Sequence, residues 1–151
     1  LDHQESVFEN GWNTILASNS VSISGKLLEL LEYDVRFSVE HRDFISVWHA
    51  YWGEARGSSL YRKLTNPRDE RYENDVRKLL RNLTKEGEYN DINVPALERG
   101  INAMMFGIWR DSHLTHGPND YANGIQAMWV YLHKVFPKHY ESQVFRKRIR
   151  Q

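Results

Sequence analysis

Three large aromatic residues and a carboxylate fall at helical spacing within residues 48–56, whose sequence is WHAYWGEAR. Residues three and four apart share a face of an α-helix, so Trp48, Tyr51 and Trp52 would form one aromatic wall. Glu54 follows Tyr51 by three residues and would bring a negative charge to the same neighbourhood. Aromatic faces beside a carboxylate are suited to hold a quaternary ammonium ion, which has no proton to donate. The alternative is that these rings only fill the core, as large aromatic side chains commonly do.

The composition limits the classes of function. A chain of 151 residues is long enough for one domain with its own core, and we expect a single domain over residues 1–151. Acidic and basic residues balance at 20 each, so no overall field would attract nucleic acid or an anionic membrane. The absence of cysteine excludes disulfides, thiolate metal sites and a cysteine nucleophile. No apolar run approaches a membrane span and no signal peptide opens the chain, so we expect a cytoplasmic protein.

Apolar residues recur at helical spacing over most of the chain, and no stretch alternates for long enough to be a strand. Ser22 or Ser24 is expected to cap the second helix, and Asp91 or Asn93 the fifth. Asn66 followed by Pro67 has the pattern of a helix start. The sequence therefore predicts an all-α fold of about six to seven helices, over residues 4–17, 22–35, 39–56, 66–87, 91–114 and 119–136, with a short turn at 60–64.

The last two long helices have apolar residues on more than one face, with small residues such as Gly107 and Ala127 alongside. Such a helix pair can bury its second face against a symmetry mate and form a four-helix bundle. We therefore expect a homodimer. The candidate interface residues are Met104, Ile108, Tyr121, Ile125, Met128, Trp129 and Leu132. Burial of these residues within one subunit is the alternative.

Three motifs occur in an order that resembles a known family. Trp48–Arg56 is similar to a W-x-x-F/Y-W-x-E-A-R helix, Met105–Trp109 stands where I-D-G-L-W would, and Gly117–Pro118 matches the turn that follows. Over about residues 25 to 140 the chain resembles the C-terminal domain of TetR-type repressors of the choline-responsive, BetI-like branch. Such repressors begin with a helix-turn-helix module of roughly 50 residues, to which nothing here corresponds. The resemblance thus implies the effector-binding and dimerisation part of a longer repressor.

The resemblance also implies a mechanism and a set of site residues. A small molecule, choline or another quaternary ammonium compound, would enter the helical core and release the full-length dimer from its operator. DNA would be contacted only through the missing module. Phe106 replaces the acidic residue of the family motif, which bears on which effector is recognised. The candidate effector-binding residues are Phe44, Trp48, Tyr51, Trp52, Met105 and Trp109, with Glu54 or Asp111 as the counter-charge.

Other classes of function have weaker support. The pair His113–His116 has ligand-like spacing, and His41 and His49 share one predicted helix, but no Glu-x-x-His or His-Glu-x-x-His motif accompanies them. No nucleophile elbow or phosphate-binding glycine loop is present. We therefore expect no metal, no cofactor and no enzymatic activity. A helical adaptor that binds a partner helix in an aromatic groove remains an alternative, as does an enzyme built on a helical bundle.

Overall fold

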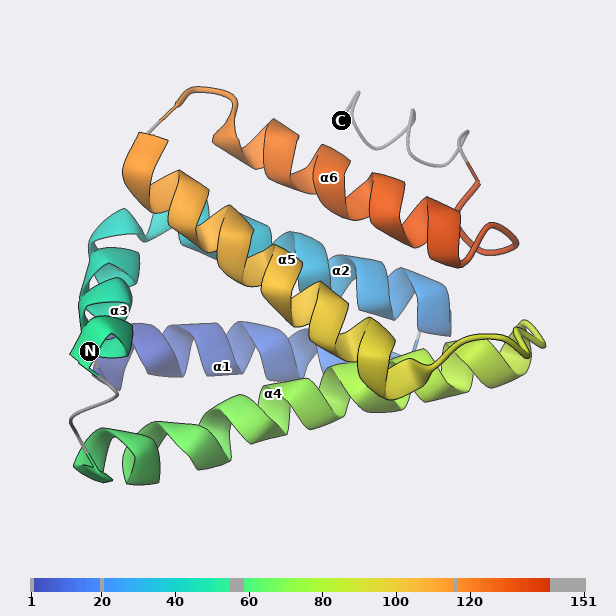
Figure 1. The fold of residues 1–151 in the computed structure, drawn as a ribbon, viewed down its shortest axis with the longest axis horizontal. Helices are drawn as coiled ribbons and strands as arrows, with labels where there is room; N and C mark the ends of the chain where they lie inside the picture. Colours follow the sequence, from blue (N-terminus) through green and yellow to red (C-terminus); the bar gives the residue numbers. More distant parts are fainter. Residues whose placement is uncertain (1, 20, 55–58, 116, 142–151) are drawn as a thin grey trace.

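The computed structural model describes residues 2–19, 21–54, 59–115 and 117–141, which form helices joined by turns, as the sequence predicted (Figure 1). The helices of this part of the chain are α1 (Asp2–Ala17), α2 (Ile23–Glu40), α3 (Arg42–Glu54), α4 (Ser59–Glu86), α5 (Val94–Thr115) and α6 (Asp120–Val135).

Helix α2 lies at the centre of the bundle and contacts each of the other described helices. Its sequence explains this position, because apolar residues occupy adjacent as well as helically spaced positions and more than one face must be buried. Figure 1 shows α1 and α4 on one side of α2, α6 on the other, and α5 crossing it. The buried side chains of α2 are Leu27, Leu28, Leu30, Leu31, Val35, Phe37 and Ser38.

Helix α3 runs across one end of the bundle, at a steep angle to the long helices (Figure 1). It packs on α5 and on the end of α2. This arrangement separates a small aromatic cluster, formed by Phe37, Phe44, Ile45 and Trp48, from the main core that the long helices share. A cavity lies where the two clusters meet.

The helix boundaries confirm part of the sequence prediction. Ser22 caps α2 and accepts a hydrogen bond from the Gly25 N–H at 3.1 Å, and Asn93 accepts one from the Ala96 N–H at 3.0 Å before α5. The predicted helix over 39–56 is wrong at its start, because α2 continues to Glu40. The break falls at His41, whose ring stacks on Phe37 while its backbone leaves the helical conformation.

The prediction that Asn66–Pro67 starts a helix is also wrong. Helix α4 begins at Ser59 and its backbone continues through both residues, so the separate short turn at 60–64 does not exist. A proline inside a helix loses its own N–H bond and crowds the carbonyl four residues earlier, at a cost of about 3 kcal/mol that the packing of the rest of α4 must offset. The predicted end of α3 at Arg56, the side chains of 60–68 and His116 lie outside the described residues.

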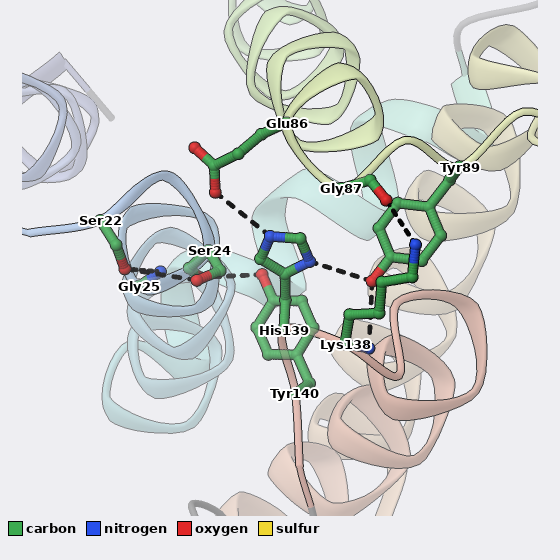
Figure 2. Close-up of polar contacts among 9 residues, drawn as sticks. All are labelled: Ser22, Ser24, Gly25, Glu86, Gly87, Tyr89, Lys138, His139 and Tyr140. Carbon is green, nitrogen blue, oxygen red and sulfur yellow. Dashed lines mark hydrogen bonds and ion pairs between the residues drawn. The ribbon is translucent and has the colours of Figure 1, made fainter.

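The end of the bundle remote from α3 is held by a polar cluster (Figure 2). His139 follows α6, and its ring bonds to the Tyr89 hydroxyl at 2.9 Å and to the Glu86 carboxylate at 3.1 Å. Lys138 donates from Nζ to the Gly87 carbonyl at 2.7 Å and from its backbone N–H to Tyr89. These bonds fix the segment after α6 against the α4–α5 turn.

The same segment also reaches the start of α2. The Tyr140 hydroxyl donates to the Ser24 carbonyl at 2.8 Å, and the Tyr140 side chain is buried (Figure 2). We call residues 138–140 with their partners the terminal clasp. It connects α2, α4 and α6 at one end of the bundle.

Close packing of α2, α5 and α6 depends on Gly124. A Cβ at this position would lie 2.9 Å from a Val35 methyl and 3.0 Å from an Ile108 methyl. We expect Gly124→Ala to lower the free energy of unfolding by about 1–3 kcal/mol because of overpacking. Urea denaturation followed by circular dichroism would measure this.

The matched control is Gly53→Ala in α3, where an added Cβ meets no atom within 4 Å. Here alanine's better helix propensity should raise the free energy of unfolding by about 0.5–1 kcal/mol. Equal effects of the two substitutions would contradict the packing argument.

Candidate functional site

A cavity of about 330 Å³ lies between α1, α2, α3, α4 and α5. Its volume is at the lower end of the range of small-molecule sites, which is about 300–1,000 Å³. Members of both core clusters line the cavity. It therefore lies where α3 crosses the end of the bundle of long helices. The aromatic lining residues are Phe8, Trp12, Phe44, Trp48, Trp52, Tyr72, Phe106 and Trp109.

One wall of the cavity comes from α3. Phe44, Trp48 and Trp52 follow one another at intervals of four residues and therefore share a face. The centroids of successive rings lie 6.0 Å apart in both pairs. Trp52 continues the wall toward α5, with its ring centroid 4.7 Å from Phe106 and 6.1 Å from Trp109.

The opposite wall is built where α1 packs near α4. Phe8, Trp12 and Tyr72 are in mutual ring contact, with centroid distances of 5.1–5.7 Å. Trp12 Nε1 donates to the Asp75 carboxylate at 3.0 Å, which fixes the orientation of its indole. The first helix of the chain thus contributes directly to the cavity lining.

The most perturbed charge of the cavity is Asp34, on α2. Trp109 Nε1 donates a hydrogen bond to Asp34 Oδ1 at 2.8 Å across the α2–α5 contact. Burial among apolar neighbours raises the pKa of Asp34 from 3.8 to about 7, although the bond from Trp109 acts in the opposite direction. This carboxyl group therefore changes charge near neutral pH.

Other polar groups of the lining are acidic or neutral. Glu5 comes from α1, Asp69 and Glu73 from α4, and Asn102 from α5. Burial, and then the charge of Glu98, raises the pKa of Glu73. Within the described part of the chain, no lysine, arginine or histidine lines the cavity. The lining thus combines aromatic faces with carboxylates, which favours a cationic ligand.

A pair of histidines lies behind the α3–α5 wall. The His49 and His113 rings stack with centroids 4.9 Å apart, and Ser46 Oγ bonds to His113 Nδ1 at 2.9 Å. His49 also packs edge-on against Trp52 and Phe106, and burial lowers its pKa. The described residues contain no group of three potential metal ligands, and His49 supports the lining rings by packing against them.

The structure brings together five of the eight predicted effector residues. Phe44, Trp48, Trp52, Met105 and Trp109 line the cavity. Tyr51 is 43% exposed on the outer side of α3, and Glu54 is exposed beyond the end of the wall. Asp111 forms a surface ion pair with Arg110 at 3.0 Å. These last three side chains do not line the cavity.

Sequence reasoning missed the lining residues of α1, α2 and α4. For Asp34 a signal was present, because it lies between Leu31 and Val35 on the apolar stripe of α2, where a solvated carboxylate is not expected. For Phe8, Trp12 and Tyr72 the pattern indicated only amphipathic helices. Which of those rings faces a cavity depends on how the helices cross.

The predicted dimer residues are placed mostly inside the subunit. Ile108, Ile125, Met128, Trp129 and Leu132 are buried in the main core, and Met128 and Leu132 have no exposed surface. Met104 and Tyr121 are partly buried against the same core. The outer surfaces of α5 and α6 instead present small, polar, charged and isolated apolar side chains, among them Ala103, Arg110, Leu114, Ala122, Gln126, Ala127 and Val130.

Comparison with known proteins shows that the chain matches one family. The family model for the C-terminal domain of BetI-type transcriptional repressors, of TetR type, matches residues 25–137. The match extends from the start of α2 to the end of α6 and includes every cavity element except α1. No curated protein and no solved structure matches the chain. Among the described residues, no helix has the length and apolar character that a bilayer crossing requires.

The raised pKa of Asp34 has a measurable effect on stability. Between pH 3.8 and about 7 the folded chain keeps this proton while the unfolded chain has lost it, so the free energy of unfolding decreases as pH rises through this window. Asp34→Asn, which retains an acceptor for Trp109, should therefore be more stable than the parent at pH 8, by about 1–4 kcal/mol. The two should differ little near pH 4. Urea denaturation at both pH values would measure this.

Asp111→Asn is the matched control, because it changes a carboxylate of an exposed ion pair. Such a pair contributes at most about 1 kcal/mol. A gain in stability for Asp34→Asn that is the same at both pH values would argue against a proton held by Asp34.

Proposed function

The chain belongs to the family of BetI-type transcriptional repressor C-terminal domains, and from this membership we propose that its cavity binds a quaternary ammonium effector such as choline. Domains of this family are the regulatory, effector-binding and dimerisation part of TetR-type repressors.

The observation that carries the proposal is the lining of the cavity. Eight aromatic rings surround a space into which the described residues bring carboxylates and no basic side chain. A desolvated cation over an aromatic face gains about 2 kcal/mol, and several faces are available here. The rings line a space among five helices, the arrangement expected of a sensor and not of a surface groove for a partner helix.

The effect of effector binding would be transmitted first to α1. Glu5, Phe8 and Trp12 reach the cavity from this helix, and Tyr33 holds it to α2 by donating to the Phe8 carbonyl at 3.1 Å. An effector that enlarges or closes the cavity would therefore move α1 relative to α2. If the effector binds one arrangement better than the other, it shifts the population, and a useful switch requires a difference of about 10²- to 10⁴-fold in affinity.

Dimerisation would use the outer surfaces of α5 and α6. These helices pack on each other, and the exposed surface of α6 carries the small residues Ala122 and Ala127 beside Val130. Small residues permit close approach of a second helix pair, which would complete a four-helix bundle.

Ligand binding can be tested with choline and its neutral isostere 3,3-dimethylbutanol. We expect choline alone to bind, with a rise in the unfolding temperature and a change in tryptophan fluorescence. Trp52→Leu should weaken choline binding by roughly tenfold, because one desolvated cation–π contact is lost. Tyr51→Leu changes the neighbouring aromatic residue, which does not line the cavity, and should leave the affinity unchanged. Equal binding of choline and the isostere would exclude a cation site.

The proposed interface can be tested with Val130→Glu, which introduces a carboxylate at a position that is 52% exposed in the single chain. Burying this charge twice in a symmetric interface should shift the protein to monomers, since each unpaired charge costs at least about 1–3 kcal/mol. Sedimentation equilibrium would measure the assembly. Val47→Glu adds the same charge to α3, where Val47 is also exposed, and should leave the dimer intact. Dimers of Val130→Glu with unchanged affinity would place the interface elsewhere.

A further inference from the structure

We propose that Asp34 is the anionic group that binds the effector's cationic centre, and that a proton and the cation compete for it. The cavity would then respond to pH and to cation concentration together. This inference rests on the proposed function, because it requires that the effector be a cation.

The geometry leaves one oxygen of Asp34 available. Oδ1 accepts the hydrogen bond from Trp109 Nε1 at 2.8 Å, whereas Oδ2 accepts none from the described residues. Asp34 lines the cavity together with the Trp109 ring that orients it. A cation in contact with Oδ2 would therefore also lie near aromatic faces, where both kinds of attraction add.

The surroundings make an uncompensated charge on Asp34 unfavourable. Burial raises its pKa to about 7, so the empty cavity holds the carboxyl group protonated for a substantial part of the time at neutral pH. The other charged lining groups are Glu5 from α1 and Asp69 and Glu73 from α4, all of the same sign. From α5 the cavity receives the neutral Asn102, and His49 of α3 packs edge-on against Trp52 and does not line the cavity. No basic group among the described lining residues can replace the proton.

A bound cation can replace the proton of Asp34. On binding, the Asp34 carboxyl group releases its proton to solvent and the cation takes its place beside the carboxylate, so charge is conserved at the site. A quaternary ammonium ion has no titratable proton of its own. Any dependence of its affinity on pH therefore arises from the titration of groups of the protein.

The test is a calorimetric titration of the chain with choline between about pH 5.5 and 8.5, in buffers that differ in ionisation enthalpy. We expect the affinity to be constant at the upper end and to fall by up to about tenfold per pH unit below a break near pH 7. Proton release should accompany binding below the break. Asp34→Asn should weaken binding at high pH and remove the break, whereas Glu73→Gln should retain it.

A second variant tests the same exchange without removing the carboxylate. Trp109→Phe keeps an aromatic ring but removes the hydrogen bond that lowers the pKa of Asp34. We expect the break to move to higher pH. If Asp34→Asn binds choline too weakly to titrate, this displacement decides the question.

The outcomes separate the two proposals. Absence of choline binding by the parent chain at every pH would overturn the proposed function, and this inference with it. Choline binding with the same affinity across the range would leave the cation site in place and overturn only the competition at Asp34. A break that persists in Asp34→Asn and disappears in Glu73→Gln would assign the exchange to Glu73 and overturn the inference.

Discussion

The fold depends on the burial of α2. This helix has buried residues over about half of its circumference, and only several neighbouring helices together can remove them from water. The five neighbours pack around it with side chains of very different size. Leu79, Leu80 and Leu83 of α4 belong to the main core, whereas Phe44 and Trp48 belong to the smaller cluster at the end closed by α3. Rings of this size, held by helices that cross at different angles, leave the cavity among them.

Polar interactions within this arrangement orient the rings as well as stabilise the fold. Trp109 and Trp12 each donate an indole N–H to an aspartate, Asp34 in one case and Asp75 in the other. The first bond joins α2 to α5 and the second joins α1 to α4. Buried indoles usually find such partners, and the choice of aspartate brings carboxyl groups close to the aromatic lining. The same side chains therefore hold neighbouring helices together and contribute to the chemistry of the site.

The sequence predicted the helical class, the family and most helix ends, because amphipathic spacing and capping residues act locally. Of the predicted aromatic wall, Trp48 and Trp52 line the cavity and Tyr51 does not. Phe44 completes the observed wall, because it shares a helical face with the two tryptophans. The sequence could not assign Asp34, Phe8 or Tyr72 to the same space, because their proximity depends on the crossing angles of α1, α2 and α4. The Asn66–Pro67 pair shows the limit of local signals, since a pattern typical of helix starts lies within the continuous α4. Glu54 and Asp111 show another, because charge near an aromatic motif in sequence lies on the outer surface.

The terminal clasp fixes one end of the bundle. Ties through Tyr89, His139 and Tyr140 hold α2, α4 and α6 at the end opposite α3. Helices α2 and α4 are thus joined at the clasp, and the cavity lies toward their other ends, near α3. A ligand that pushes the cavity walls apart would displace the helix ends near α3 more than the ends held by the clasp. Since α1 begins at the α3 end (Figure 1), we expect the largest displacement on ligand binding near the start of that helix.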